Sequence, residues 1–157
     1  MAQKHIKIVA KKLQEYADRG VFRSFEAGKT KASKTNFRFN WLEDTLFTLV
    51  LDHEKSTLKL KNLLPGIESK SFLDNDLRVF IDGRSTPSLP PHRRIDSKRA
   101  ELRYSNRKGL VSLILTVHNN QFSYGLTKLL NVTNELFGHL HMNHIQYLYE
   151  EFDVPQE

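Results

Sequence analysis

The sequence predicts an α+β domain with one antiparallel sheet and helices at both ends of the chain. Two stretches carry most of this prediction. Residues 110–117 alternate apolar side chains on one face, which is the pattern of a strand. Residues 126–140 place apolar side chains at i, i+3, i+4 and i+7, which is the stripe of an amphipathic helix. Taken with the rest of the chain, the predicted order is α-β-β-β-α-β-β-α-α, with about five strands.

The first half of the chain predicts one helix, a loop and three strands. Residues 3–18 carry an apolar helical stripe, and Gly20 is placed to cap its end. Residues 27–36 lack apolar periodicity and are rich in small and basic residues, so we expect a flexible basic loop there. Period-2 alternation then predicts strands at about 37–41 and 58–61, and an apolar run rich in β-forming residues predicts one between them at 46–51.

The second half predicts a short helix, two strands and two C-terminal helices. Ser71 and Asp74 have the spacing of a capping box before a helix that ends near Gly83. Residues 84–97 contain three prolines and several basic residues, so they predict a surface connection. Strands are expected at 100–104 and 110–117, followed by the long helix and a last helix near 145–152.

Length and composition favour one domain over residues 1–157, located in the cytoplasm. The chain has no cysteine, which excludes disulfides, thiol catalysis and cysteine metal sites. No apolar run approaches the roughly 20 residues of a membrane-spanning helix, and we see no signal peptide, so we expect no membrane partner. The net charge of +6 is concentrated in residues 1–34 and 92–109, whereas residues 110–157 are acidic.

The predicted order of elements resembles the type III secretion chaperone-like fold of class I secretion chaperones and YbjN-like bacterial proteins. The resemblance spans Ile6 to Phe152 and lies in the order of elements. It implies a homodimer that binds a partner polypeptide and has no enzymatic activity. By this resemblance the middle helix is the candidate dimer and partner-binding element, with Leu73, Leu77, Phe80 and Ile81 as its apolar residues.

The alternative hypothesis is a nucleic-acid-associated protein with a basic sheet face. Basic residues oppose apolar ones on several predicted strands, and a basic stretch begins at residue 92. Such a face could follow a phosphate backbone and release counterions. The candidate polyanion-binding residues are Lys59, Lys61, Arg93, Arg94, Arg99 and Arg103.

No catalytic residue, cofactor or metal site is predicted from a motif. Gly28-Lys29-Thr30 lacks the upstream glycine, the preceding strand and the following helix that a phosphate-binding loop needs. His139, His141 and His144 form a cluster in which only His141 and His144 have the spacing of paired ligands on a helix, so we interpret it as an exposed helix junction. An enzyme whose site is assembled from distant residues is a third hypothesis.

Overall fold

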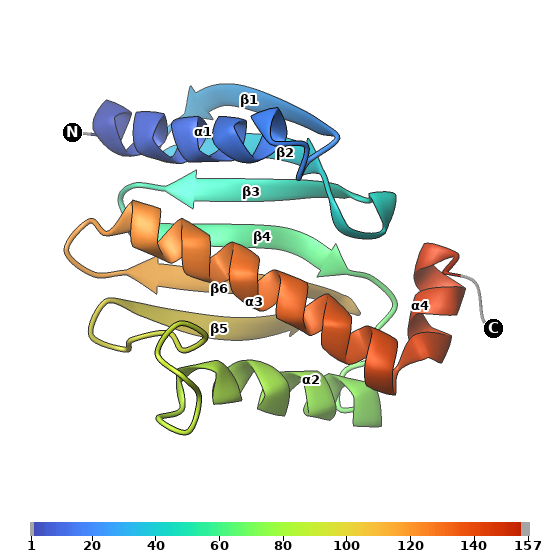
Figure 1. The fold of residues 1–157 in the computed structure, drawn as a ribbon. Coiled ribbons are helices and arrows are strands. Elements are labelled where there is room, and N and C mark those ends of the chain that lie inside the picture. Colours follow the sequence, from blue (N-terminus) through green and yellow to red (C-terminus); the bar gives the residue numbers. More distant parts are fainter. Residues whose placement is uncertain (1, 155–157) are drawn as a thin grey trace.

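In the computed structural model, which describes residues 2–154, six antiparallel strands form one sheet and four α-helices accompany it (Figure 1). The helices and strands in chain order are α1 (Ala2–Asp18), β1 (Ser24–Lys31), β2 (Lys34–Asn40), β3 (Leu46–Asp52), β4 (Thr57–Leu64), α2 (Phe72–Asp82), β5 (Ala100–Arg107), β6 (Leu110–Val117), α3 (Phe122–Asn143) and α4 (Ile145–Phe152). Short 3-10 turns at Leu42–Asp44 and Gly83–Ser85 complete the regular structure of this part of the chain. The predicted α+β class and order of elements are confirmed, with six strands where about five were expected.

The strands lie side by side in the order β1-β2-β3-β4-β6-β5. The first four form a meander, in which each strand pairs with the next one along the chain. The chain then leaves the sheet through α2 and returns as the β5–β6 hairpin, which places β6 beside β4. This crossover brings the two halves of the sequence into one sheet.

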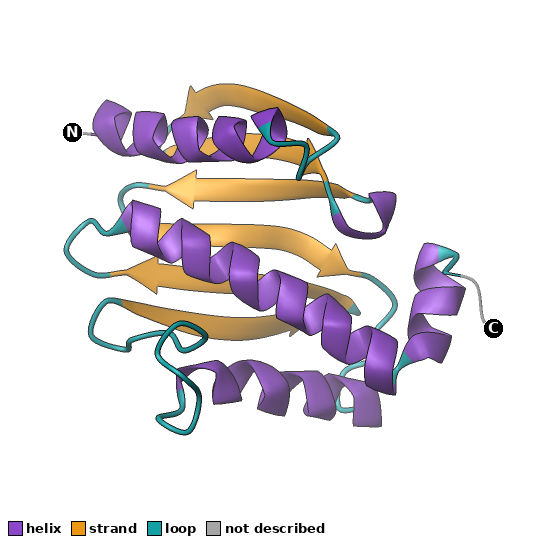
Figure 2. Cartoon of the chain, viewed as in Figure 1, coloured by secondary structure: helices purple, strands orange, loops and turns teal. Residues whose placement is uncertain are grey.

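Helices α1 and α3 lie on one face of the sheet, with α2 along its β5 edge and α4 beyond the strand ends, and the core is the layer between α1, α3 and the sheet (Figures 1 and 2). The register sets one row of fully buried leucines across the central strands, with Leu49 opposite Leu60 and Leu60 opposite Leu113. Among the described residues, no helix is both long and apolar enough to span a membrane. Because strand side chains alternate between faces, burying one face leaves the other without a helical cover.

Helix α3 packs closely against the sheet at Gly125. A Cβ atom at this position would overlap a methyl group of Val117 and lie 2.7 Å from Cδ2 of Leu115. The missing side chain therefore allows the backbone of α3 to pack directly on β6. Further along the same helix, a Cβ atom at Gly138 would meet no neighbouring atom within 4 Å.

Helix α2 is held to β5 by a buried hydrogen-bond cluster around Asp74. Its N-terminus is capped as predicted, because the hydroxyl of Ser71 accepts a hydrogen bond from the Asp74 amide. The carboxylate of Asp74 in turn accepts hydrogen bonds from the Tyr104 hydroxyl at 2.8 Å, the Asn106 amide at 2.9 Å and the backbone N–H of Lys70 at 3.0 Å. Burial alone raises the pKa of Asp74, but these donors and the nearby Arg78 hold it below its usual range.

The prediction of a loop at residues 27–36 is wrong, because this segment forms most of the β1–β2 hairpin. The strand β1 is almost entirely exposed, so it lacks the apolar alternation by which strands are recognised. Gly28 belongs to an irregularity in the pairing, where a Cβ atom would lie 2.8 Å from the carbonyl oxygen of Asn36. Residues 86–99 form turns between α2 and β5, in keeping with the predicted proline-rich connection.

Two alanine substitutions in α3 test the close contact between this helix and the sheet. We expect Gly125→Ala to destabilise the protein by about 1 kcal/mol or more, because the added methyl group overpacks the interface with β6. Gly138→Ala is the matched control and should stabilise the protein by about 0.5–1 kcal/mol, since alanine favours the helix and meets no neighbour. Urea unfolding measures both, and equal effects of the two substitutions would contradict the packing described above.

A second test concerns the Asp74 cluster. Asp74→Asn places an amide N–H group against donors, so we expect a loss of about 1–3 kcal/mol at neutral pH, whereas Asp82→Asn on the exposed side of α2 should be nearly neutral. Because the pKa of Asp74 is lowered by folding, its contribution is fully present above the ordinary aspartate pKa of about 3.9 and is lost as the pH falls through the folded value. Unfolding curves from pH 7 to pH 2.5 should therefore converge for the wild type and Asp74→Asn. A constant difference at all pH values would contradict this assignment.

Candidate polyanion-binding face of the sheet

The side of the sheet opposite the helices carries a concentration of basic side chains, and we refer to this side as the open sheet face. Residues on this side alternate with the buried residues of the same strands, so they are exposed or half-buried. Lys29, in the irregular part of β1, lines a hollow on this side. Seven further basic residues lie on it through regular strand pairing, namely Lys31, Lys34, Arg38, Lys59, Lys61, Arg103 and Arg107. They come from β1, β2, β4 and β5, so only the folded sheet brings them together.

The strand register places Lys59 at the centre of the open sheet face. On one side it stands opposite Val50 of β3, and on the other side opposite Ile114 of β6, which in turn stands opposite Arg103 of β5. Neighbouring strands lie about 4.8 Å apart, so Lys59 and Arg103 are separated by roughly 10 Å across the sheet. This distance is close to the Debye length of about 8 Å at physiological ionic strength, so the fields of the two cations overlap.

The positive charges of the open sheet face are not neutralised within the described chain. Burial lowers the pKa of the Lys59 ammonium group, and the charges of Lys61, Arg107, Lys34 and Arg103 lower it further. Over residues 2–154, none of the seven basic side chains of this face has an ion pair with a carboxylate. The face therefore has a positive potential that an anion would relieve.

Two adjoining hollows follow the basic residues across the strands. One has a volume of about 340 Å³ and lies between Lys59, Arg103 and Arg107. The other has a volume of about 280 Å³ and lies between Lys31, Lys34 and Lys61. Lys34, Val50 and Lys59 line both hollows, so the two form one continuous basic surface.

Acidic residues occupy the margins of the open sheet face rather than its centre. Glu26 on β1 stands opposite Arg38, and Glu101 lies at the start of β5, where it is 3.9 Å from His118. Asp52 is buried and accepts hydrogen bonds from the backbone N–H groups of Glu54 and Lys55, so its carboxylate holds the β3–β4 turn. Asp52 also stands opposite Lys34 and lines the same hollow as Lys59 and Arg103, but among the described residues it forms no ion pair with these cations.

The structure divides the six predicted polyanion-binding residues between two places. Lys59, Lys61 and Arg103 lie on the open sheet face as predicted. The other three lie beside the connection between α2 and β5, on the helix side, where Arg93 forms an ion pair with Glu135 at 3.1 Å and Arg99 stacks over the ring of Tyr124 at 3.6 Å. Arg93 and Arg99 hold the connection against α3, Arg94 donates to the backbone oxygen of Pro87 within the connection, and none of the three belongs to the same surface as the lysines.

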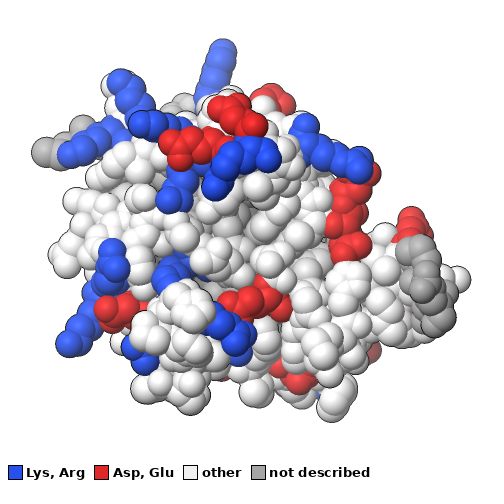
Figure 3. Space-filling model, viewed as in Figure 1, with Lys and Arg blue, Asp and Glu red and all other residues white. Residues whose placement is uncertain are grey.

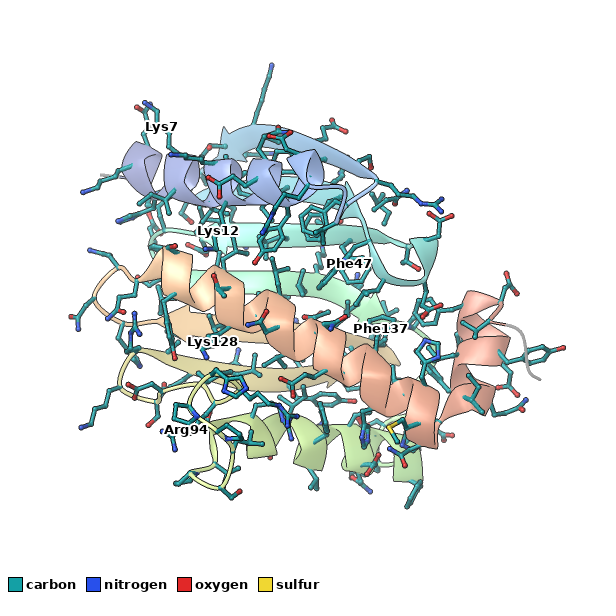
Figure 4. The ribbon with its side chains drawn as sticks, viewed as in Figure 1. Lys7, Lys12, Phe47, Arg94, Lys128 and Phe137 are labelled. Carbon is teal, nitrogen blue, oxygen red and sulfur yellow. The ribbon has the colours of Figure 1, made fainter. Side chains whose placement is uncertain are left out.

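A separate hollow of about 560 Å³ adjoins this connection (Figure 4). Lys128 of α3 and Arg94 of the connection line it. The Lys128 ammonium group is nearly buried and donates hydrogen bonds to the backbone oxygens of Pro91 and His92, at 3.4 and 3.1 Å. Burial and the neighbouring Arg99 and Arg94 lower the pKa of Lys128, with Glu135 opposing them. Because its protons are bonded to the connection, Lys128 anchors that segment.

Charge on the helix side is arranged differently from charge on the open sheet face. Figure 3 shows Lys and Arg over α1 and beside the connection at the lower left, with Asp and Glu among them. Several of these basic groups form ion pairs. Arg84 pairs with Glu135 at 2.6 Å, and Arg23 pairs with Asp44 at 3.1 Å. The sequence could not separate the two surfaces, because residues of both kinds occur in the same basic stretches.

The predicted partner-binding residues of α2 face mainly inward. Leu77 and Ile81 are fully buried in the core, and Leu73 and Phe80 are half-buried against it. The four residues therefore do not form an exposed surface in the folded monomer. The exposed apolar residues of α2 are instead Phe72 and Val79, with exposed fractions of 80% and 71%.

The histidine cluster is also divided, and an aspartate distant in the sequence takes part in it. The Nε2 atom of His141 contacts the carboxylate of Glu43, whereas His139 and His144 both contact Asp76 of α2. The helical spacing favours His141 and His144 as the compatible pair, but the structure pairs His144 with His139. The physical reason is that α3 ends at Asn143, which redirects His144.

No family model, curated protein or solved structure compared with this chain matches it. The resemblance to the type III secretion chaperone-like fold therefore stays a prediction, and functional conclusions depend on the geometry of the chain itself.

Proposed function

We propose that the protein binds nucleic acid by its phosphate backbone, with the open sheet face as the contact surface. The observation that carries the proposal is the set of seven basic side chains on one uncovered face, without ion-pair partners in residues 2–154. Phosphate contacts by lysine and arginine release condensed counterions, which supplies most of the free energy of non-specific binding. An extended nucleic acid backbone has the charge density that such a surface complements.

The side chains between the cations favour backbone contact over recognition of bases. Thr48 and Val50 of β3, Ile114 of β6 and Ser105 of the edge strand β5 occupy positions between the basic residues. Aromatic platforms are the usual means by which sheets stack unpaired bases, and the described aromatic residues of β2 and β3, such as Phe37 and Phe47, are buried on the opposite face. Binding of this kind depends on salt and has little dependence on sequence.

A second candidate function, protein interaction through a homodimer, has one observation in its favour. Phe72 and Val79 lie on the outer side of α2, and both are exposed, which is unusual for large apolar side chains on the same helix. A second copy of the chain is the occupant that this patch fits, since a two-fold axis places the same apolar patch on both sides of the interface. The resemblance to the chaperone-like fold also selects α2 as the dimer element. The exposed residues Phe72 and Val79 differ, however, from the contact residues that were predicted on it.

The nucleic acid proposal is tested by neutralising the centre of the open sheet face. We expect the triple variant Lys59→Gln, Lys61→Gln, Arg103→Gln to bind a labelled DNA duplex at least about tenfold more weakly, because three phosphate contacts are removed. The slope of log K against log salt should fall in magnitude by about 2–3. Fluorescence anisotropy between 50 and 200 mM salt, with duplex DNA and single-stranded RNA of one length, measures both quantities.

The matched control for this test removes three charges from the helix side. Lys4→Gln, Lys7→Gln, Lys11→Gln lowers the net charge equally, but these residues lie on the exposed side of α1. The control should retain most of the affinity. Equal losses in both triple variants, or no binding by the wild type at 50 mM salt, would rule out the open sheet face as a nucleic acid surface. Tighter binding to vesicles of anionic lipid than to either nucleic acid would assign the face to membranes instead.

The homodimer is tested by making the exposed patch of α2 polar. Light scattering should give the wild type twice the chain mass of 18.3 kDa, and Phe72→Ser, Val79→Ser should restore the monomer, because the interface loses its apolar contacts. Leu46→Ser changes another exposed apolar residue, at the start of β3, and should leave the dimer intact. A wild-type monomer at millimolar concentration would end the homodimer proposal.

A further inference from the structure

Asp76, His139 and His144 converge outside the open sheet face, at the corner where α2 meets the ends of α3 and α4. The Nε2 atom of His139 lies 2.8 Å from Oδ2 of Asp76, and the Nε2 atom of His144 lies 2.5 Å from the same oxygen. The three potential ligand atoms all lie within 4.8 Å of one another. Two imidazole nitrogens are thus directed at a single carboxylate oxygen.

A break in the helical backbone brings the two histidines together. In a continuous helix, residues five positions apart point about 140° away from each other around the axis. His144 stands at the junction of α3 and α4 with φ −141° and ψ 43°, so it is not helical, and its ring can turn toward the same side as His139. The two rings lie 5.6 Å apart between their centroids. The spacing in the sequence could not show this convergence.

The cluster is partly enclosed, and aromatic rings form part of its wall. The side chains of His144, His139 and Asp76 are 12%, 19% and 32% exposed. The ring of Phe80 stacks on His139 at 4.4 Å, and the ring of Phe72 lies 6.2 Å from His144. Hydrogen bonds from His144 and His139 lower the pKa of Asp76.

We propose that Asp76, His139 and His144 form a binding site for a divalent transition-metal ion, for which Zn²⁺ is the best match. Two imidazole nitrogens and one carboxylate oxygen are ligands that zinc prefers, at about 2.0–2.2 Å. Ligands on such an ion lie about 3.3 Å apart, so small rotations of these side chains convert the observed cluster into a coordination site. Three protein ligands leave a fourth position open to water or to a small anionic ligand.

Asn143 fixes the position of His139 at the end of α3. Its side-chain amide nitrogen lies 3.2 Å from Nδ1 of His139 and donates a hydrogen bond to the backbone oxygen of the same residue, also at 3.2 Å. These contacts leave Nε2 of His139 directed at Asp76. The site does not depend on the proposed nucleic acid contact, because its ligands come from the helices and not from the sheet.

Zinc titration of the full chain tests the site, with Zn²⁺ alone as the probe and a chromophoric chelator as the competitor. We expect one tightly bound ion per chain. Each of Asp76→Asn, His139→Gln and His144→Gln should weaken binding at least tenfold, because each removes one of three ligands. Substitution of Co²⁺ should give the intense visible absorption of a four-coordinate centre, and the three variants should lose it.

Two controls separate this site from the other histidines. His141 lies only two residues from His139, but it contacts Glu43 and not Asp76. His141→Gln should therefore bind zinc like the wild type. His5 and His53 are a second pair of neighbouring histidines, because burial and then nearby charges, His53 among them, lower the pKa of His5. The double variant His5→Gln, His53→Gln should bind zinc like the wild type. Circular dichroism of each variant checks that the fold is intact. Zinc binding that survives all three ligand substitutions, or that is lost equally in a control, would overturn the assignment.

Discussion

The packing of α1 and α3 on the same face of the sheet is the constraint on which the rest of the structure depends. The meander and the β5–β6 hairpin form a single surface, and α1 and α3 cover only one side of it. Every second strand residue is therefore drawn into one apolar layer. The remaining strand residues must be compatible with water, but this requirement does not select their charge. Threonine, serine and glutamate would satisfy it as well as lysine and arginine do.

The basic character of the open sheet face thus opposes folding slightly rather than assisting it. The lowered pKa of Lys59 means that its charged form is less stable in the folded chain than in water, first because of burial and then because of the cations around it. On the helix side, by contrast, Glu135 accepts ion pairs from both Arg84 and Arg93. A set of cations that folding does not neutralise is more simply explained by an external anion than by stability.

The sequence predicted those features that depend on local periodicity, and it failed where tertiary contacts decide. The pattern at residues 110–117 and the Ser71 cap are local, and both are found in the structure. The hairpin strand β1 was missed because it is exposed on both sides, so pairing with β2 alone determines its conformation. For the candidate sites, alternation identified Lys59, Lys61 and Arg103, but nothing local distinguishes Arg99, which turns to Tyr124 instead.

Helix α2 carries one buried carboxylate, Asp74, and one half-buried carboxylate, Asp76. Asp74 and Asp76 are two residues apart, which places them about 200° apart around the helix axis. Asp74 is therefore directed to Tyr104 and Asn106 of the sheet, while Asp76 is directed to His139 and His144 at the helix junction. The first carboxylate has its hydrogen-bond donors supplied entirely by the protein, in a buried position. The second shares one oxygen between two imidazoles at a partly open corner. This contrast is why we assign Asp74 to the stability of the fold and Asp76 to the binding of an ion.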